Sequence, residues 1–356
     1  MLSRMRAARV GERMSDVTIL ELTDPRWRDF VASQPSAIPF HHPDWGRVIA
    51  DCYGFRAFAI ATSDAAGDIR AGLPVMEVRH LWGEPKWVTL PFTDYCPPLI
   101  PASHQETDLV RVLQRASKAA GIRRVEVRAP LSGTSSGSRA GFRHVIALEE
   151  DPDRVFARFH SAVRTHIRQA GRRGVTIRRA EGPEDEDTFY RLHLRTRRRQ
   201  GVPVQPRRFF RMLWEYVVRP GLGTVLIAEA SGQPVAADMF LSWNGTSIGK
   251  FSASDERAWR LRANNLVIWH CIKTACEQGS RSFDFGRTDA GNEGLRAFKS
   301  SWGAVEEPLV YETLGATPES APARSGMADH LLASVIRHGP PVICRAAGGV
   351  LYRYAA

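Results

Sequence analysis

The sequence predicts an α/β (α+β) fold of two domains, each a mixed sheet flanked by helices. A chain of 356 residues is longer than one ordinary core requires and suits two domains. Hydrophobic residues make up 43% and charged residues 24%, close to the averages of globular proteins, so most of the chain should fold. Short apolar runs with strand-like spacing alternate with amphipathic helical patterns, the order expected of sheets covered by helices.

A segment rich in serine and glycine, residues 131–141, is predicted to be a loop between the halves. The predicted organisation is a basic, disordered leader at 1–16, a first domain at 17–148, a second at 149–315, a linker at 316–329 and a helical tail at 330–356. The tail is broken at Gly339-Pro340-Pro341. Its amphipathic pattern suits a cover over a domain face, with a helix lying on a membrane as the alternative.

In the first domain, strands are predicted where apolar residues recur at strand spacing, namely at 17–22, 57–62, 72–80, 86–90 and 124–128. Asp24-Pro25 opens a first helix, because aspartate caps helix N-termini and proline fits the first turn. Two more helices are expected, one following Pro43 to about Cys52 and one over 108–120.

In the second domain, Asp151-Pro152 is predicted to open one helix that runs to Gly174, with an apolar stripe from Val155 to Ile167. Ser231-Gly232 and Asn244-Gly245 are predicted hairpin turns. The other predicted helices are 184–199, 206–218 and 264–278, and the predicted strands are 175–178, 225–241 (a hairpin), 247–253, 282–285 and 309–313.

The net charge of +11 and the pI near 9.9 favour a polyanionic partner such as RNA, a nucleotide diphosphate or an anionic membrane surface. Only five of the 49 basic residues are lysines. Such a ratio is equally expected from a codon-composition bias, so both explanations of the charge stay open.

The five cysteines, Cys52, Cys96, Cys271, Cys276 and Cys344, form no Cys-x-x-Cys pair and are predicted to be buried thiols in a reducing compartment. The arginine-rich start lacks the apolar core of a secretory signal, and the chain has no apolar run long enough to span a membrane. We therefore expect a cytoplasmic protein. No His, Cys or Asp cluster has metal-ligand spacing, so no metal is expected.

The segment from Ser282 to Gly303 carries the strongest functional signal. A short apolar run ends at Asp284-Phe285-Gly286-Arg287, a loop follows, and a short helical segment then carries Phe298-Lys299 before Trp302-Gly303. A simpler explanation is that Phe298 and Trp302 are core residues and that Lys299 is solvated. The flanking motifs at these spacings favour a functional lysine.

This segment resembles the closing signature of the Fem peptidyltransferases and of the BioF2-like branch of the GNAT acyltransferases. The resemblance runs from about Val17 to Thr313. Four further motifs carry it: Phe40-His-His-Pro-Asp-Trp45, Pro91-Phe-Thr-Asp-Tyr95, Arg164 to Val175, and Thr196 to Pro203. It implies tandem GNAT-like domains that transfer an acyl or aminoacyl group to an amine. It also implies catalytic roles for Phe298, Lys299 and Asp284, with Lys299 steadying the developing oxyanion.

The resemblance further implies an acceptor cleft formed by the first half and its boundary with the second. The implied substrate-binding residues are Asp44, Trp45, Arg47, Asp94, Tyr95, Thr196, Arg198, Arg199 and Arg287. Arginine suits phosphate because its planar fork binds two oxygens. A solvated helix end explains the arginines at 197–199 equally well. The proton of the attacking amine could pass to Asp94, Asp238, Asp284 or the substrate itself.

The donor would contact Arg262, Asn264 and Asn265, in the position of the pyrophosphate loop of CoA-binding GNATs. Segment 260–266 contains no glycine, which weakens that loop and favours aminoacyl-tRNA over acyl-CoA as the co-substrate, with no bound cofactor.

The expected function is therefore a Fem-like transferase acting on an amine of a phosphate-bearing cell-envelope or natural-product precursor. A CoA-dependent N-acetyltransferase of an amino sugar or lipid precursor is the alternative, and a non-catalytic RNA-binding or surface-binding protein is a third possibility that the Lys299 signature argues against. The expected partners are a small-molecule or lipid-linked amine and tRNA, with a peripheral contact at the inner membrane surface as a further option. The sequence does not indicate an oligomeric state.

Overall fold

The computed structural model describes residues 17–79, 83–101, 105–132, 137–315 and 326–354. The predicted leader and the first part of the predicted linker lie outside these residues. Contacts between residues divide the chain into two units, which are described separately: residues 1–140 with 309–319 and 353–356, and residues 141–308 with 320–352.

The first unit is a mixed sheet with helices on both faces. Its strands lie in the order β1-β2-β3-β4-β5-β12, of which only β4 and β5 pair in parallel. The strands are β1 (Thr18–Glu21), β2 (Arg56–Ser63), β3 (Ile69–Val78), β4 (Lys86–Val88), β5 (Arg124–Val127) and the end of β12 (Val305–Gly315). The helices are α1 (Pro25–Ser33), the 3-10 turn Pro39–His41, α2 (Pro43–Tyr53) and α3 (Glu106–Ala119).

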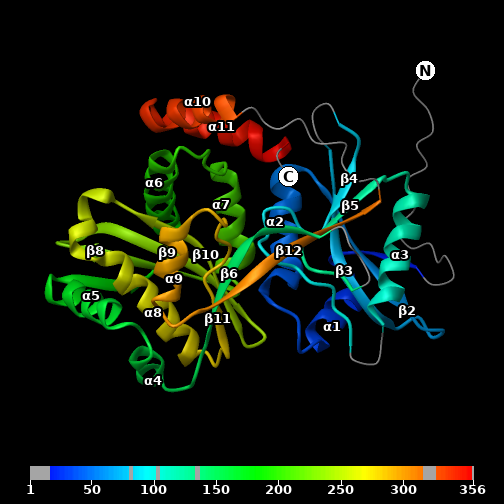
Figure 1. Ribbon diagram of the computed structural model, residues 1–356, viewed down its shortest axis with the longest axis horizontal. Helices are drawn as coiled ribbons and strands as arrows, with labels where there is room; N and C mark the ends of the chain where they lie inside the picture. Colours follow the sequence, from blue (N-terminus) through cyan, green and yellow to red (C-terminus); the bar gives the residue numbers. More distant parts are fainter. Residues whose placement is uncertain (1–16, 80–82, 102–104, 133–136, 316–325, 355–356) are drawn as a thin grey trace. The chain divides into compact units, whose positions relative to one another are not determined.

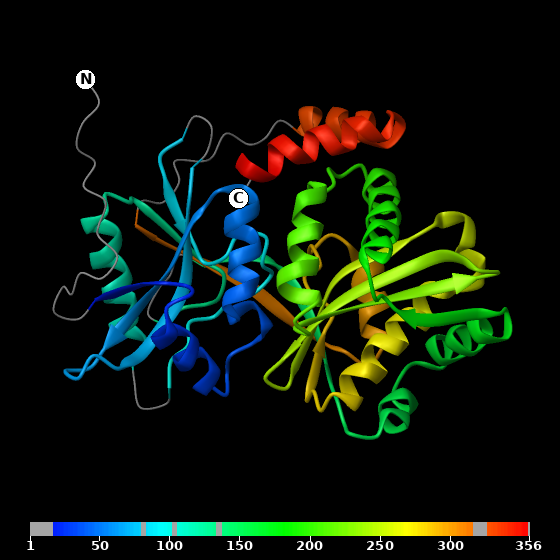
Figure 2. The same cartoon turned by 180° about the vertical axis from the view of Figure 1, so that it is seen from behind.

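Helix α3 covers one face of this sheet, and α1 and α2 lie against the other (Figures 1 and 2). Leu109, Val112, Leu113 and Ala116 of α3 pack against strand residues such as Trp87 in one apolar core. Asp24 caps α1 by accepting from the backbone N–H of Arg26, so the predicted start of this helix is confirmed.

The second unit is a six-stranded sheet in the order β6-β11-β10-β9-β8-β7, in which only β10 and β11 pair in parallel. The strands are β6 (Ser138–Ala147), β7 (Val175–Arg179), β8 (Gly223–Ala230), β9 (Gln233–Trp243), β10 (Thr246–Ser254) and β11 (Ser282–Asp284). The helical elements are α4 (Pro152–Ala157), α5 (Ser161–Arg172), α6 (Pro183–Gln200), α7 (Arg207–Leu213) with the π-helical turn Trp214–Val218, the 3-10 helix η3 (Glu256–Leu261), α8 (Ala263–Glu277) and α9 (Glu293–Ser300).

Helices α4, α5 and α8 lie against one face of this sheet, and α6 and α7 lie against the other (Figure 1). The core between α8 and the sheet includes Val267, Ile272, Phe240 and Phe283, with Trp302 buried beside them. The apolar side chains of α8 therefore hold this helix against β8 and β9, where it forms one wall of the site described below.

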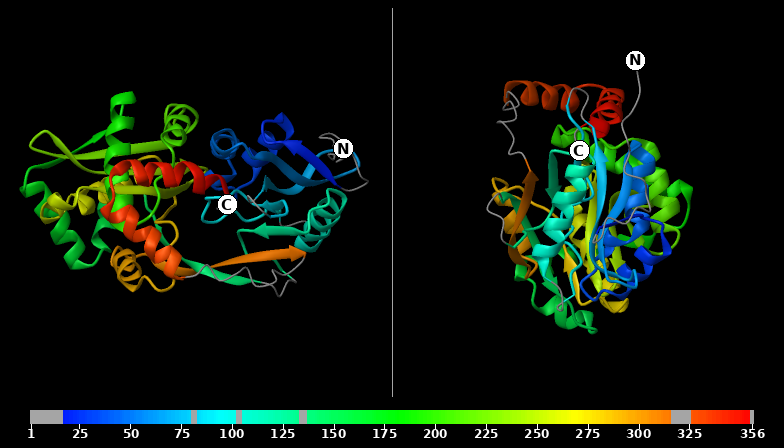
Figure 3. Two further views of the ribbon diagram at one scale, coloured as in Figure 1. Left: turned by 90° about the horizontal axis from the view of Figure 1, so that it is seen from above. Right: turned by 90° about the vertical axis from the view of Figure 1, so that its right-hand side faces the viewer.

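The tail forms two helices, α10 (Gly326–His338) and α11 (Pro341–Tyr354), separated at the predicted break. Figure 3 shows them over α6. Arg198 donates to the Gly339 carbonyl at 2.6 Å, and Gly348 packs against the backbone of Val204 so closely that a methyl group would overlap its carbonyl oxygen. The tail thus covers a face of the second unit, which confirms the predicted cover over a domain face. Among the helices that the structure describes, none is both long and apolar enough to cross a membrane.

The structure differs from three of the predicted features. The single helix predicted from Asp151 to Gly174 is two helices, because His160 takes an extended backbone conformation and caps α5. Strand β6 begins at Ser138, inside the predicted loop 131–141. The unit boundary falls at Gly141, not at residue 149, and residues 309–315 join the first unit because this part of β12 pairs with β5.

Candidate functional site

A cavity of about 520 Å³ lies in the second unit, where β10 and β11 stop pairing. The two strands pair only as far as Ile248 and Asp284, while β10 continues to Ser254. The opening between them is lined by β9, β10, α8 and α9 and by the C-terminal end of α6. Five phenylalanines contribute to the lining: Phe240, Phe251, Phe283, Phe285 and Phe298.

Strand β10 has a β-bulge in the cavity wall. Gly249 pairs with Phe240 and Phe251 pairs with Met239, so Lys250 is an extra residue between two paired positions. A bulge interrupts the ladder of backbone hydrogen bonds and is common beside active sites. The wall therefore offers backbone polar groups to a ligand as well as side chains.

Lys299 lies on α9 in the cavity wall and is 6% exposed. Its ammonium donates to the carbonyl oxygens of Gly286 at 2.7 Å and Arg287 at 3.3 Å. The alternative of a solvated lysine is therefore wrong. Phe298 also lines the cavity and packs on Trp302, which is fully buried.

Asp284 anchors the loop that Lys299 holds. Its carboxylate accepts from the Gly286 backbone N–H at 2.8 Å and lies 3.7 Å from the Arg143 guanidinium. Nearby, the Nε2 atom of the buried His144 lies 3.1 Å from a carboxylate oxygen of Glu306. Burial lowers the pKa of His144, and the positive charge of Lys299 lowers it further, so this imidazole is neutral near pH 7. Asp284 thus shapes the lysine site but is not among the cavity-lining residues.

The N-terminus of α8 forms a second polar end of the cavity. Arg262 precedes the helix with φ of 59°, a left-handed conformation that is uncommon for arginine, and no side chain caps the helix. The guanidinium of Arg173 in turn donates to the carbonyl of Arg260 and holds the loop. Uncapped N–H groups and the helix dipole favour an anion here. Arg262, Asn264 and Asn265, the residues expected to contact the donor, all line this end.

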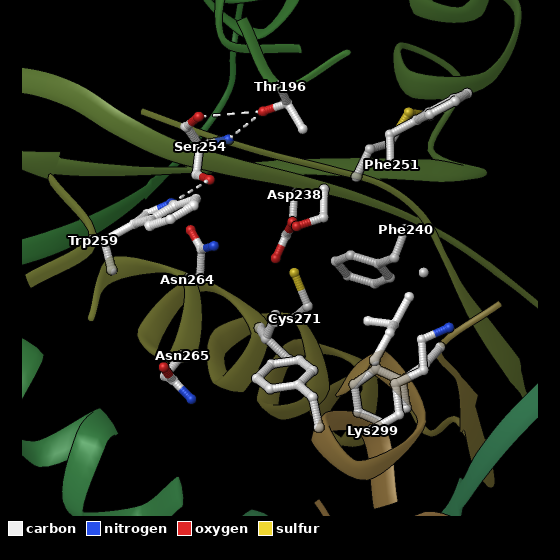
Figure 4. A pocket seen from close by; sticks show the side chains of 18 of the residues that line it. Thr196, Asp238, Phe240, Phe251, Ser254, Trp259, Asn264, Asn265, Cys271 and Lys299 are labelled. Atoms are coloured by element: carbon white, nitrogen blue, oxygen red, sulfur yellow. Dashed lines mark hydrogen bonds between the residues drawn. The ribbon is translucent and has the colours of Figure 1, made fainter. Parts of the chain in front are cut away.

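The C-terminal end of α6 closes the same end of the cavity (Figure 4). Thr196 Oγ1 receives the Ser254 N–H at 2.9 Å and donates to the Ser254 carbonyl at 3.2 Å, which fixes α6 to β10. Arg199 donates to the same carbonyl at 3.1 Å, and its guanidinium lies 4.8 Å from the ring centre of half-exposed Trp259. Arg199 is therefore held in place at the mouth of the cavity.

Asp238 lies at the inner part of the cavity, with the thiol of Cys271 on α8 close to it (Figure 4). Its carboxylate oxygens are buried and have no hydrogen bond of ordinary geometry within the described residues. Burial raises the pKa of this carboxyl to about 7, and the nearby Ser252 hydroxyl offsets the effect only in part.

The structure brings together one group of the predicted site residues. Those that line the cavity are Thr196, Arg199, Arg262, Asn264, Asn265, Phe298 and Lys299. Arg198 does not, because it binds the tail. Arg287 does not either; it pairs with Asp289 at 2.7 Å.

The other five predicted substrate-binding residues lie in the first unit. Trp45 is fully buried and donates to Thr93 at 2.8 Å, so it is a core residue and its assignment to substrate binding was wrong. The carboxylate of Asp44 lies 3.5 Å from Nδ1 of His42, and the guanidinium of the half-exposed Arg47 lies 3.5 Å from the carboxylate of Asp51. The Asp94 carbonyl accepts from Tyr311 at 2.8 Å, and Tyr95 packs on the core. Their part in an acceptor cleft stays a prediction.

Several residues of the cavity could not be identified from local sequence patterns. The bulge at Lys250 and the positions of Trp259 and Cys271 have no local signal, and Asp238 was one of several possible proton acceptors. In the described part of the chain, no three His, Cys, Asp or Glu side chains are placed to hold a metal ion.

Residues 157–300 match the acetyltransferase (GNAT) domain family. The fold of the chain is similar to that of FemX, at 14% identity with a TM-score of 0.67 over 83% of this chain and 96% of FemX. A tandem GNAT protein from the clavulanic acid biosynthesis pathway is similar at 13% identity and a TM-score of 0.53, over 85% of this chain and 99% of that one.

The lysylphosphatidylglycerol synthetase L-PGS from Bacillus licheniformis is also similar, at 13% identity and a TM-score of 0.50, over 85% of this chain and 98% of that one. No curated protein matches the sequence. The matched domain contains the whole cavity, and the shared fold extends over both units. Residues 157–300 therefore match a GNAT acetyltransferase domain, and the fold of the chain is similar to that of FemX and of a tandem GNAT protein.

Proposed function

We propose that this protein transfers an aminoacyl or acyl group from a phosphate-bearing donor to an amine. The observation that carries the proposal is that one cavity is lined both by Lys299 and by the uncapped N-terminus of α8. A cation held rigidly by two carbonyls can stabilise charge that develops on a carbonyl oxygen. The helix N-terminus can bind the donor's phosphate.

Aminoacyl-tRNA is the proposed donor, and acyl-CoA is the second candidate. The turn before α8 forms without glycine, through a left-handed Arg262, and the guanidinium of this residue adds a positive charge to the lining of the cavity. The charge of +11 suits a nucleic acid. The same helix N-terminus would also suit the pyrophosphate of CoA, so the donor has to be tested directly.

In the proposed reaction, the acceptor nitrogen attacks the donor carbonyl and a C–N bond forms. The C–O bond of the ester, or the C–S bond of a thioester, then breaks, and the leaving oxygen or sulfur takes up the proton that the amine loses. Lys299 stabilises the negative oxygen between these steps. Asp284, engaged by Gly286 and Arg143, positions the Lys299 loop and is not a proton acceptor in this scheme.

The proposed acceptor is a small-molecule or lipid-linked amine that bears phosphate, such as a cell-envelope precursor. The similarity to L-PGS supports a lipid-linked acceptor. The exposed Leu331, Val342 and Val350 of the tail helices support a peripheral contact with the inner membrane surface. Sedimentation with anionic vesicles should recover the protein, and full recovery in the supernatant would exclude this contact.

The test is mass spectrometry of products from mixtures of candidate amines with either charged tRNA or acyl-CoA. We expect an aminoacylated amine from charged tRNA with the wild-type protein and a strongly reduced yield with Lys299→Met. Acyl transfer from CoA alone would replace the first donor with the second. Absence of product from either donor would remove the proposed function.

A further inference from the structure

Asp238 is the acidic residue of the cavity that lacks an ion pair among the described residues. The other carboxylate in the lining, Asp255, pairs with Arg195 at 2.7 Å. Asp238 is only 6% exposed, and neither of its oxygens has a hydrogen bond of ordinary geometry in the described part of the chain. A buried carboxylate without a partner is costly, because it loses its hydration without compensation.

The position of Asp238 on β9 makes this carboxylate unexpected. Strand β9 lies between β8 and β10, and Asp238 pairs with Leu226 on one side and Ser252 on the other. Ala236 and Phe240, two residues away in each direction and hence on the same face, belong to the apolar core beneath α8. Packing alone would favour an apolar side chain between them.

The surroundings of Asp238 suit a cation. Cys271 is the neighbouring residue of α8, and its thiol is neutral because burial raises its pKa. The lining of the cavity also includes the aromatic rings of five phenylalanines. A ligand cation in such a place gains both a carboxylate partner and contact with aromatic rings.

We infer that Asp238 binds the primary ammonium group of a substrate. This inference rests on the proposed transfer reaction and names the chemistry of a reactant: the ammonium belongs to an aminoacyl donor or to the amine acceptor. From Asn264 to Cys271, α8 makes about two turns, so Asp238 lies roughly 10 Å along the helix from the phosphate end. An ammonium on Asp238 gives this carboxylate the ion-pair partner that it lacks among the described residues, and a plain acetyl group has no group for this site.

Two matched pairs of probes test the inference at pH 7.5 by isothermal titration calorimetry. The donor pair is 3′-deoxy-3′-(alanylamino)adenosine and its propionylamino counterpart, which differ only in the amine. The acceptor pair is glucosamine 1-phosphate and glucose 1-phosphate. We expect the wild type to bind the amine member of one pair about 10- to 100-fold more tightly, the range for a hydrogen bond to a charged group.

Asp238→Asn keeps the size of the side chain and removes its charge, so it should abolish the preference and leave binding of the amine-free member unchanged. Asp238→Ala serves the same purpose if the amide variant does not fold. Asp255→Asn is the matched control, since asparagine can keep the cap that Asp255 provides to the Arg257 N–H, and it should retain the preference.

The pair that shows the preference identifies the source of the ammonium. If the wild type shows no preference in either pair, or if Asp238→Asn keeps it, the ammonium site is overturned. Product formation in the mass-spectrometric assay is scored separately. Transfer without an amine preference would therefore leave the proposed function in place and remove only this inference.

Discussion

At the level of single residues, the cavity contains two buried ionisable side chains, Lys299 and Asp238, and they differ in their hydrogen-bond partners. Lys299 is held by the carbonyl oxygens of Gly286 and Arg287. Asp238 has no such partner among the described residues. The lysine is therefore preorganised in its charged form, whereas the charge of the aspartate depends on pH and on what binds beside it.

Lys299→Met should lower kcat about 100- to 1,000-fold, as expected when one oxyanion donor is lost. The buried ammonium also satisfies two carbonyls, so the variant should lose about 1–3 kcal/mol of stability, in place of the unchanged stability expected for a solvated lysine. Lys299→Arg should not restore activity, because a planar guanidinium cannot place its charge at the same point. Lys273→Met, on the exposed side of α8, is the control for rate and stability. A Lys299→Met enzyme within threefold of wild type would disprove the role.

Asp238→Asn should stabilise the free protein at pH 8. Burial raises the carboxyl pKa from 3.8 to about 7, so the folded state holds its proton more tightly than the unfolded state. The native state therefore loses stability relative to the variant as pH rises from about 4 through 7, by up to about 4 kcal/mol. Urea denaturation at pH 5 and pH 8 should show a difference between the two proteins that grows with pH. An equal difference at both pH values would contradict the raised pKa.

At the level of elements, the tail helices depend on one close approach. Gly348→Ala should cost about 1–3 kcal/mol, because the added methyl group overlaps the Val204 carbonyl and pushes α11 away from the loop after α6. Gly349→Ala is the neighbouring control: its methyl group meets nothing, and alanine favours the helix by about 1 kcal/mol. Urea denaturation and the rate of tryptic cleavage within the tail measure the effect of each of the two substitutions. Similar behaviour of the two variants would mean that α11 is not docked as described.

Most elements could be predicted from the sequence because their signals are local. The Asp24-Pro25 cap and the Ser231-Gly232 and Asn244-Gly245 turns each specify a structure within a few residues. The break at His160 was missed because Phe159 and Val163 continue a helical stripe across it. Strand β6 was missed because its first residues lie in a Ser/Gly-rich segment.

The site could be predicted only in part. Lys299 and the residues before α8 lie in recognisable motifs, and the structure brings them into one cavity. Asp238 could not be singled out, because its burial and lack of an ion pair arise from its packing against β8, β10 and α8, and no local pattern within β9 indicates this packing. Trp45 was wrongly predicted to bind substrate because it lies in a recognisable motif, whereas its side chain packs in the core.

For the whole molecule, the charge of +11 means that the salt dependence of binding can test whether the donor is a nucleic acid. If the donor is aminoacyl-tRNA, its binding should weaken steeply between 50 and 200 mM salt, by roughly 10³-fold if six phosphates are contacted. Filter binding with uncharged tRNA measures this. Micromolar CoA should then leave the melting temperature unchanged, whereas a clear thermal shift would favour the CoA donor. Arg262→Ala should reduce the salt slope, and an unchanged slope would mean that Arg262 makes no phosphate contact.

The chain leaves the first unit at Ala140 and returns to it only at Leu309, with the second unit between. On the ribosome, β5 is consequently made long before β12, its partner on that side of the sheet. At roughly 5–20 residues per second, synthesis from Gly141 to Gly315 takes roughly 10–35 s. During that time the nascent first unit presents an unpaired strand edge, the kind of surface that recruits chaperones or aggregates. Release from this state requires residues 141–308 and then β12 to emerge, so a message truncated before β12 would yield an incomplete sheet in the first unit and not an independent amino-terminal domain.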